Sequence, residues 1–254
     1  MADMKLEVGI KGHKQQTNIN DITIPEKLRE RKQTGLTWFD GALGSDSEGF
    51  VPSSVMMLTG GPGAGKTTAL LQMADSIMEQ GHMCLFNTGE QSLFQVAMMS
   101  ERLKLKHGFI AGQDINCGEV LNHADNIMKS HPKKQLFILQ DSLPTLDDGK
   151  YSDGGTTGAT PIRCAEMLTN YAKKHYAIVI FINHVNKNGD FVGKNTVKHA
   201  VDQHAMLYID DKKNSETFGE RLFTIPKNRF GSSGKTIIVG MNKTGLYEKG
   251  SIEI

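Results

Sequence analysis

The chain contains 254 residues, 38% of them hydrophobic and 22% charged, which is enough to bury the core of one large α/β domain. Its 29 basic and 28 acidic residues give a net charge of +1, so binding of nucleic acid would have to come from a local patch. Its 3 cysteines lie far apart, which argues against a zinc module and indicates a reducing compartment. We find no signal peptide and no apolar run of membrane-spanning length, and therefore expect a soluble, cytoplasmic protein without a membrane partner.

Residues 1–33 are polar and mixed in charge. They are expected to form a partly disordered tail, with a short basic helix near 26–32 and docking on a neighbouring subunit as the alternatives. The domain is expected to occupy residues 34–254. Near its start, Trp38, Phe39 and Leu43 have helical spacing, which predicts a short helix packed on a sheet.

A phosphate-binding loop of the pattern G-x-x-x-x-G-K-[ST] follows the apolar strand predicted at residues 55–58. Strong helix formers continue the chain to about Gln80. Glycines let the backbone N–H groups turn toward an anion, Lys66 can reach the β- and γ-phosphates, and the Thr67 hydroxyl can bind Mg²⁺. The residues expected to hold the nucleotide are Gly60, Gly61, Gly63, Ala64, Gly65, Lys66, Thr67 and Thr68.

The next predicted strand, 83–87, leads into Glu90. Ser92 is expected to cap a helix over 93–105, with Met98, Met99 and Leu103 on its inner face. The remaining elements expected before the next motif are a short strand near 109–110 and a helix over 117–130.

The apolar run at residues 136–142 contains Asp141 at its carboxyl end, which is the Walker B pattern. Ligands bind at this end of the strands in open α/β sheets, so Asp141 is expected to hold Mg²⁺ through water. A second apolar strand, 177–182, ends at His184. The other elements expected in this half are a polar loop at 147–161, a helix at 161–175, a second polar loop at 186–198, and strands near 204–210, 220–226 and 236–241. The last three follow one another without helices, which predicts an antiparallel meander at the sheet edge.

These segments together resemble the ATPase core of the RadA/Sms family of DNA-repair proteins, which is part of the RecA superfamily. The resemblance runs from about Thr34 to Lys249. Its most specific part is the string Lys-Asn-Arg-Phe-Gly at residues 227–231, which separates RadA from RecA recombinases. The other matched segments are 34–36, 43–44, 60–68, 88–92, the Walker B strand, 184–189, 199–202 and 244–246.

The resemblance implies an α/β fold of the RecA-like P-loop type, with a central, mainly parallel sheet flanked by helices and an antiparallel C-terminal edge. It implies an ATPase that uses ATP and Mg²⁺, forms a homo-oligomeric ring, most simply a hexamer, and acts on single-stranded DNA as a helicase or branch-migration motor. A recombinase is a possible partner.

The resemblance also implies roles for single residues. Glu90 would orient or deprotonate the attacking water, or it would only complement a helix dipole. His184 would sense the γ-phosphate, or it would be an ordinary polar residue at a strand end. Lys227 and Arg229, placed on a strand and turn at the far edge of the sheet, would reach the ATP of a neighbouring subunit, or they would form a basic turn on an exposed edge.

The loop at 186–198 is expected to face the ring channel. Lys187, Lys194 and Lys198 would contact DNA phosphates, and Phe191 could stack on a base. A solvated loop is the alternative, because three lysines in such a stretch are unremarkable on this chain.

The chain departs from the family pattern in several places. We find no match to the four-cysteine zinc finger or to the Lon-protease-like domain that RadA proteins usually carry. Gln91 stands where the family has a second Glu, and Gln140 stands where it has an aliphatic residue. Two other functions therefore stay open: a RecA-type filament recombinase, and a nucleotide-dependent assembly switch without DNA translocation.

Overall fold

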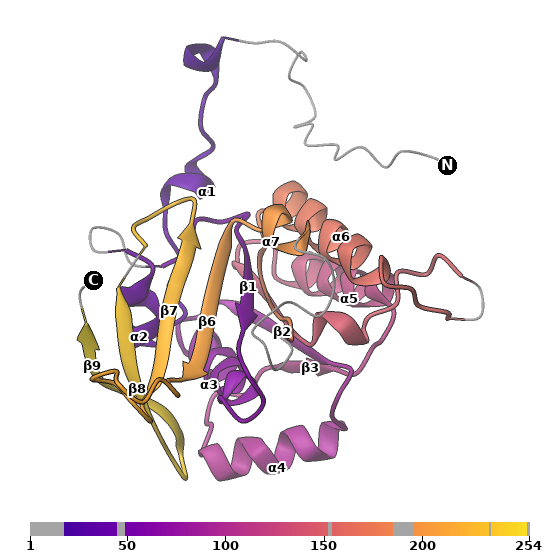
Figure 1. The fold of residues 1–254 in the computed structure, drawn as a ribbon. Coiled ribbons are helices and arrows are strands. Elements are labelled where there is room, and N and C mark those ends of the chain that lie inside the picture. The colour runs from indigo at the N-terminus through magenta and orange to yellow at the C-terminus, as the bar shows by residue number, and fades with distance from the viewer. Residues whose placement is uncertain (1–17, 45–48, 152–153, 185–195, 234, 253–254) are drawn as a thin grey trace.

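A computed structural model describes residues 18–44, 49–151, 154–184, 196–233 and 235–252 (Figure 1). One nine-stranded sheet organises them, with the strand order β3-β2-β4-β5-β1-β6-β7-β8-β9. The strands are β1 (Val55–Thr59), β2 (Met83–Thr88), β3 (Ile110–Gly112), β4 (Leu136–Asp141), β5 (Ile178–Ile182), β6 (Gln203–Ile209), β7 (Arg221–Asn228), β8 (Thr236–Asn242) and β9 (Gly245–Ile252).

The helices lie on both sides of this sheet (Figure 1). Their bounds are α1 (Glu26–Arg29), α2 (Thr37–Ala42), α3 (Lys66–Glu79), α4 (Leu93–Leu103), α5 (Cys117–Ser130), α6 (Thr160–His175) and α7 (Thr196–Ala200), with 3₁₀ turns η1 (Ile19–Asp21) and η2 (Leu143–Thr145). One hydrophobic cluster joins the sheet to α2, α3 and α4, and a second joins its other face to α5, α6 and α7. The fold is therefore a three-layer α/β arrangement.

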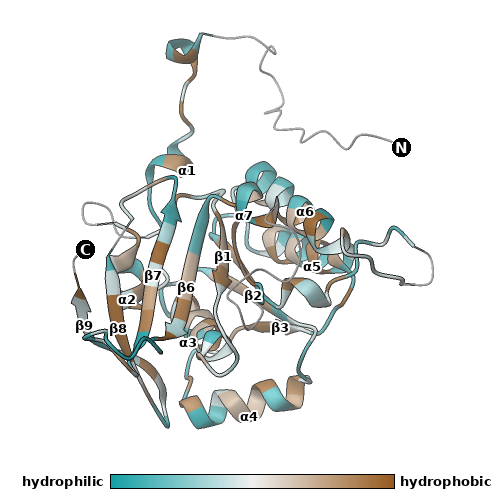
Figure 2. Ribbon diagram, viewed as in Figure 1, coloured by the Kyte–Doolittle hydropathy of each residue, from teal (hydrophilic) through white to brown (hydrophobic). Residues whose placement is uncertain are grey.

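The first six strands of the sheet order run parallel to one another, from β3 to β6. The remaining strands β7, β8 and β9 are antiparallel to their neighbours. This confirms the predicted mainly parallel sheet with an antiparallel C-terminal edge. Figure 2 shows hydrophobic residues concentrated in the central strands, as expected for a sheet covered on both faces.

Local sequence explains most of the elements. β5 has the sequence Ile-Val-Ile-Phe-Ile and is fully buried, and α4 begins with a capping box in which Ser92 and Gln95 exchange hydrogen bonds. Trp38 is 5% exposed and packs edge-on against Phe223 of β7 at 5.1 Å between ring centroids, which confirms the predicted short helix and its core role.

Three expectations need correction or completion. Met98 was expected in the core but is 68% exposed, because α4 faces the sheet through Val96, Met99 and Leu103 instead. The sequence reading omitted β9, which forms the edge of the sheet beyond β8. The tail contains helix α1 where a short basic helix had been an alternative.

Candidate active site

The phosphate loop connects β1 to α3, as its sequence predicts. Gly60 has a φ of 154°, and a Cβ built on it would lie 1.9 Å from the carbonyl oxygen of Leu207, so only glycine fits between the loop and β6. Gly65, with a φ of 102°, precedes the first turn of α3. The loop therefore ends at a helix N-terminus, where backbone N–H groups and the helix dipole favour an anion.

Lys66 lies back over this loop. Its Nζ donates hydrogen bonds to the carbonyl oxygens of Gly60, at 2.8 Å, and Gly61, at 3.0 Å. Burial lowers the pKa of Lys66, while the carboxylates of Asp141 and Glu90 oppose that effect. The ammonium group is thus held at the loop by neutral acceptors, and a phosphate placed in the loop would give it a charged partner.

Thr67 and Asp141 come together although they are 74 positions apart in the sequence. The Thr67 hydroxyl donates a hydrogen bond to Oδ2 of Asp141 at 2.6 Å. Burial raises the pKa of Asp141, although the hydrogen bond from Thr67 opposes this. A hydroxyl and a carboxylate beside a phosphate loop are the oxygen donors that Mg²⁺ uses together with substrate phosphates and water, so these residues fit that ion.

Glu90 follows β2, the strand that pairs with the Walker B strand β4. Its Oε1 accepts a hydrogen bond from Ser142 Oγ at 2.5 Å and lies 2.8 Å from His184 Nε2. Partial burial works to raise the pKa of Glu90, but the contacts with Ser142 and His184 and the charge on Lys66 outweigh it, so the pKa lies below its ordinary value. The carboxylate is therefore kept ionised, which is the form that a general base requires.

Several curated proteins similar to this chain share one name. The DNA repair protein RadA of Haemophilus influenzae is 31% identical over 231 residues, and that of Rickettsia conorii is 32% identical over 225 residues. These alignments cover 91% and 89% of this chain. This chain is a homologue of RadA. It spans about half the length of these relatives, 47% of the first and 48% of the second. No protein-family profile matches the chain.

Solved structures of other proteins have the same fold as this chain. The chain superposes on a DnaB-like replicative helicase with a TM-score of 0.66 and 14% identity, over 76% of this chain and 57% of the other. It superposes on a second solved ATPase domain with a TM-score of 0.70 and 15% identity, over 83% of this chain and 88% of the other. At such low identity the likeness concerns the fold, which is that of RecA-like ATPase domains.

The Lys-Asn-Arg-Phe-Gly string that carries the resemblance to RadA lies at the end of β7. β7 lies between β6 and β8, so the expectation of an edge strand is wrong, but its pairing with β8 runs only from Arg221 to Thr224 and stops before Lys227. Asn228 pairs with Gln203 at the start of β6, which runs parallel to β1. The string therefore lies at the amino ends of the parallel strands, away from the phosphate loop of its own chain.

Both cations of this string contact their own chain. Lys227 Nζ donates to the carbonyl oxygens of Lys198, at 2.8 Å, and Val201, at 2.7 Å. Arg229 forms an ion pair with Asp202 at 3.1 Å. Burial and the nearby Arg229 lower the pKa of Lys227. In the isolated chain these side chains thus brace the segment between α7 and β6.

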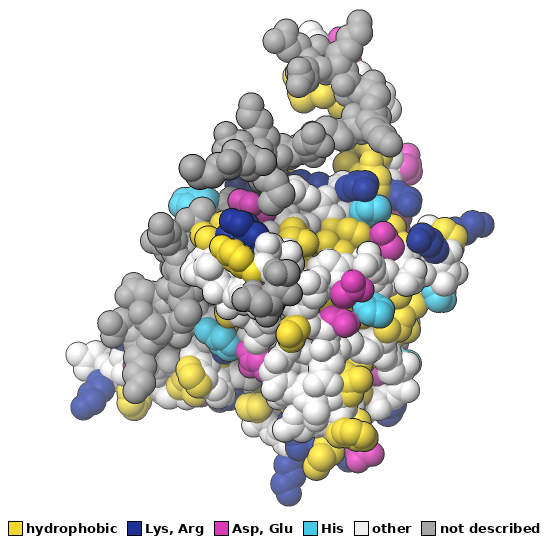
Figure 3. Space-filling model, turned by 90° about the vertical axis from the view of Figure 1, so that its right-hand side faces the viewer, with side chains coloured by type: hydrophobic (Ala, Val, Ile, Leu, Met, Phe, Trp, Pro, Cys, Tyr) yellow, Lys and Arg dark blue, Asp and Glu magenta, His cyan; other side chains and the backbone are white. Residues whose placement is uncertain are grey.

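Three of the four residues expected to bind DNA, Lys187, Phe191 and Lys194, lie outside the described residues. Lys198 lies on α7, not in a loop, and its side chain is partly buried. On the face shown in Figure 3, basic side chains are interspersed with acidic and hydrophobic ones. Within the described part of the chain no helix is long and apolar enough to cross a membrane.

The sequence reading missed two residues of the site. Ser142 directly follows the Walker B Asp141, and its position could have suggested it. Arg221, at the start of β7, donates from Nε to the carbonyl oxygen of Ala64 in the phosphate loop at 2.7 Å. No local pattern marks Arg221, because this contact joins residues 157 positions apart.

Proposed function

We propose that this chain is an ATP-hydrolysing motor domain that works as a homo-oligomeric ring on single-stranded DNA, in the manner of a RadA-type helicase or branch-migration protein. One observation carries the proposal. The phosphate loop, Thr67 with Asp141, and Glu90 come from three separate segments and meet at the carboxyl ends of β1, β2 and β4. This is the arrangement that phosphoryl transfer to water requires: a phosphate cradle, a metal site and a base.

Each of these residues has a task in the proposed reaction. The backbone N–H groups of the loop and the Lys66 ammonium bind the β- and γ-phosphates and stabilise the charge that develops in the transition state. Mg²⁺, held by Thr67 directly and by Asp141 through water, would neutralise the same phosphates. Glu90 orients a water molecule toward the γ-phosphate and takes its proton.

His184 ties the base to the proposed DNA-binding segment. It contacts Glu90 and follows shortly after the end of β5, and the chain then enters the segment that carries Lys187, Phe191 and Lys194. If Glu90 exchanged its contact with His184 for a contact with water at the γ-phosphate, His184 could move, and the segment that follows it would move with it. This connection supports coupling between the nucleotide and DNA.

Ring assembly is supported by residues 18–31, which we call the arm. The arm projects from the domain (Figure 1) and exposes three isoleucines, Ile19, Ile22 and Ile24. At its base, a guanidinium nitrogen of Arg31 donates to the carbonyl oxygen of Phe230 at 2.5 Å. A neighbouring subunit that covered the isoleucines would therefore also lie near the turn that carries Arg229. Within such a ring, Lys227 and Arg229 would exchange their own-chain contacts for the neighbour's ATP.

The proposal is tested by measuring ATP hydrolysis with and without single-stranded DNA, together with particle shape by negative-stain microscopy. We expect rings and a rate that rises with DNA. A hydrolysis rate that does not change when DNA is added would favour the assembly switch. Filaments on DNA, in place of rings, would favour a recombinase. Absence of hydrolysis under all conditions would refute the ATPase assignment.

A further inference from the structure

Two buried amide side chains face each other next to the catalytic edge of the sheet. Asn87 of β2 and Gln140 of β4 are paired in register, and they are 1% and 0% exposed. Asn87 Nδ2 donates to Gln140 Oε1 at 2.8 Å. Residues two positions earlier on these strands, Leu85 and Ile138, share this face and belong to the apolar cluster under α5 and α6. An apolar pair would fill this layer, so the two amides call for an explanation.

Backbone groups fix which way each amide points. The N–H of Asp114 donates to Asn87 Oδ1 at 3.0 Å, and Asn87 Nδ2 donates to the Asp114 carbonyl oxygen at 2.8 Å. Because a backbone N–H can only donate and a carbonyl can only accept, Asn87 has a single satisfied orientation. Its NH₂ group then meets the oxygen of Gln140, which directs the NH₂ group of Gln140 the other way.

That second NH₂ group reaches the active site. Gln140 Nε2 donates to the carbonyl oxygen of Ser142 at 3.1 Å, and the same oxygen accepts from Thr145 Oγ1 at 2.7 Å. The hydroxyl of Ser142 in turn donates to Glu90. Hydrogen bonds thus run from Asp114 through the two amides to the backbone carbonyl of Ser142, and the side chain of the same residue contacts the carboxylate of the proposed base.

We propose that the Asn87–Gln140 pair is a positioning device, which sets the direction of the Ser142 hydroxyl and through it the place of Glu90. The inference rests on the proposed ATPase function. Neither amide touches the nucleotide site, since both side chains lie on the face of the sheet opposite α3.

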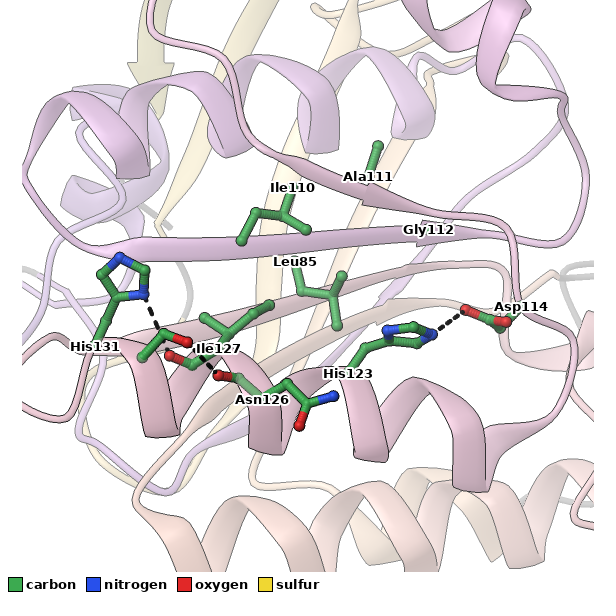
Figure 4. A pocket seen from close by; sticks show the side chains of 10 residues that line it. Leu85, Ile110, Ala111, Gly112, Asp114, His123, Asn126, Ile127 and His131 are labelled. Carbon is green, nitrogen blue, oxygen red and sulfur yellow. Dashed lines mark hydrogen bonds and ion pairs between the residues drawn. The ribbon is translucent and has the colours of Figure 1, made fainter.

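The outer end of the device lies at the protein surface. The carboxylate of Asp114 is 3.3 Å from Nε2 of His123, at a pocket of about 290 Å³ between the edge strand β3 and α5 (Figure 4). Ile110 of β3 and Ile127 of α5 supply apolar lining. The positioning device therefore extends from the edge strand β3, across β2 and β4, to Ser142 and Glu90.

The test replaces the amides and follows turnover. Gln140→Leu should lower kcat for ATP about five- to tenfold, the scale of one hydrogen bond, and leave KM and nucleotide affinity within about twofold. The matched control is Gln135→Leu, because Gln135 precedes the same strand at its far end and donates to the carbonyl oxygen of Tyr176 at 2.8 Å. This control should leave kcat unchanged.

A double-mutant cycle separates positioning from general damage. Added to Glu90→Gln, the Gln140→Leu change should have less than about a twofold further effect, because both act through one carboxylate. The combined Asn87→Val and Gln140→Leu variant leaves neither of these two side-chain amides unpaired, although Asp114 loses the partner of its backbone N–H and carbonyl groups. Its stability is therefore measured by urea unfolding, and under conditions where it is folded it should still show the lowered kcat.

A second readout does not depend on activity. Crystal structures of the nucleotide-free wild type and of Gln140→Leu should differ at Ser142, with the hydroxyl turned away from Glu90 in the variant. An unchanged kcat, an equal loss in the Glu90→Gln background, or an intact Ser142–Glu90 hydrogen bond would each overturn the inference. If the wild type hydrolyses no ATP, the proposed function fails, while the crystal comparison still decides whether the amides hold Ser142.

Discussion

The hydroxyl of Thr67 and the carboxylate of Asp141 are joined by a hydrogen bond of 2.6 Å, although they come from α3 and β4. β4 is separated from β1, the strand before the phosphate loop, by β5. The contact therefore depends on the positions of the strands in the sheet, which differ from their sequence along the chain. It unites the two sequence motifs at a single site.

Lys66→Ala should abolish ATP hydrolysis and weaken ATP binding, because the phosphates lose a buried cation held at the loop by two carbonyl groups. Phosphate release and binding of a fluorescent nucleotide measure the two effects. Lys134→Ala is the matched control, since Lys134 also donates to a backbone carbonyl, that of Gly81, far from the loop. Unchanged turnover in the purified Lys66 variant would refute the assignment of the phosphate loop.

Glu90→Gln should bind ATP with Mg²⁺ normally and hydrolyse it at least ~10²-fold more slowly, since an amide cannot accept the proton of the attacking water. It should also trap the assembled, DNA-bound state. Single-turnover kinetics and equilibrium binding measure these effects. Glu101→Gln, on the exposed side of α4, is the control. A variant that lost stability but kept its turnover would show that Glu90 only complements a helix dipole.

Asp75→Asn should destabilise the fold by about 1–3 kcal/mol at neutral pH, because its carboxylate accepts the backbone N–H groups of Lys106, His107 and Gly108. Partial burial works to raise the pKa of Asp75, but these hydrogen bonds outweigh it and keep the pKa below its ordinary value. A depressed pKa stabilises the protein above the unfolded-state pKa, and this contribution is lost as the pH falls through the folded-state value.

The difference between Asp75→Asn and the wild type should accordingly shrink below about pH 4. Urea unfolding at neutral and acidic pH measures it. Glu79→Gln on the same helix is the control, because that side chain is mostly exposed. A difference in stability that is the same at both pH values would contradict the electrostatic explanation.

Replacement of Lys187, Lys194 and Lys198 by alanine should weaken binding of single-stranded DNA and flatten its dependence on salt, because fewer counterions are released. Basal ATP hydrolysis should persist. Alanine at the exposed lysines Lys129, Lys133 and Lys174 is the control. If the slope of log affinity against log salt does not change, these residues do not contact DNA.

Arg229→Ala should lack a cation for the ATP of the neighbouring subunit while keeping its own phosphate loop. Alone, this variant and Lys66→Ala should each be nearly inactive, whereas rings that contain both should recover activity at the junctions that combine an intact loop with an intact Arg229. Steady-state ATP hydrolysis of the mixture measures the recovery.

The ion pair of Arg229 with Asp202 offers a control for this mixing experiment. Asp202→Asn breaks the same ion pair and leaves the arginine in place, so it should retain activity if Arg229 acts on the neighbour. Co-assembly of the two variants without any recovery would mean that Arg229 acts within its own chain or not at all.

The sequence by itself determined the fold class, and it supplied the residues of the candidate site around the phosphate loop. The phosphate loop, the carboxylate after an apolar run and the alternation of strands and helices are local patterns, since glycine torsions, strand burial and helix capping depend on near neighbours. Even the C-terminal meander could be predicted, because strands that follow one another directly pair antiparallel. Where both faces of a helix carry apolar residues, as at Met98 of α4, the pattern could not say which face is buried.

Only the tertiary structure decided which residues meet. The sequence marked Gln140 as unusual, but its role depends on the register of β4 with Asn87 and on the turn that brings back Ser142. It likewise marked Lys227 and Arg229, yet placed them on an edge strand, whereas β7 lies between β6 and β8. Hydrogen bonds between strands are set by the order and register of the sheet, which arise from the packing of the whole domain and leave no trace in the sequence around any single residue.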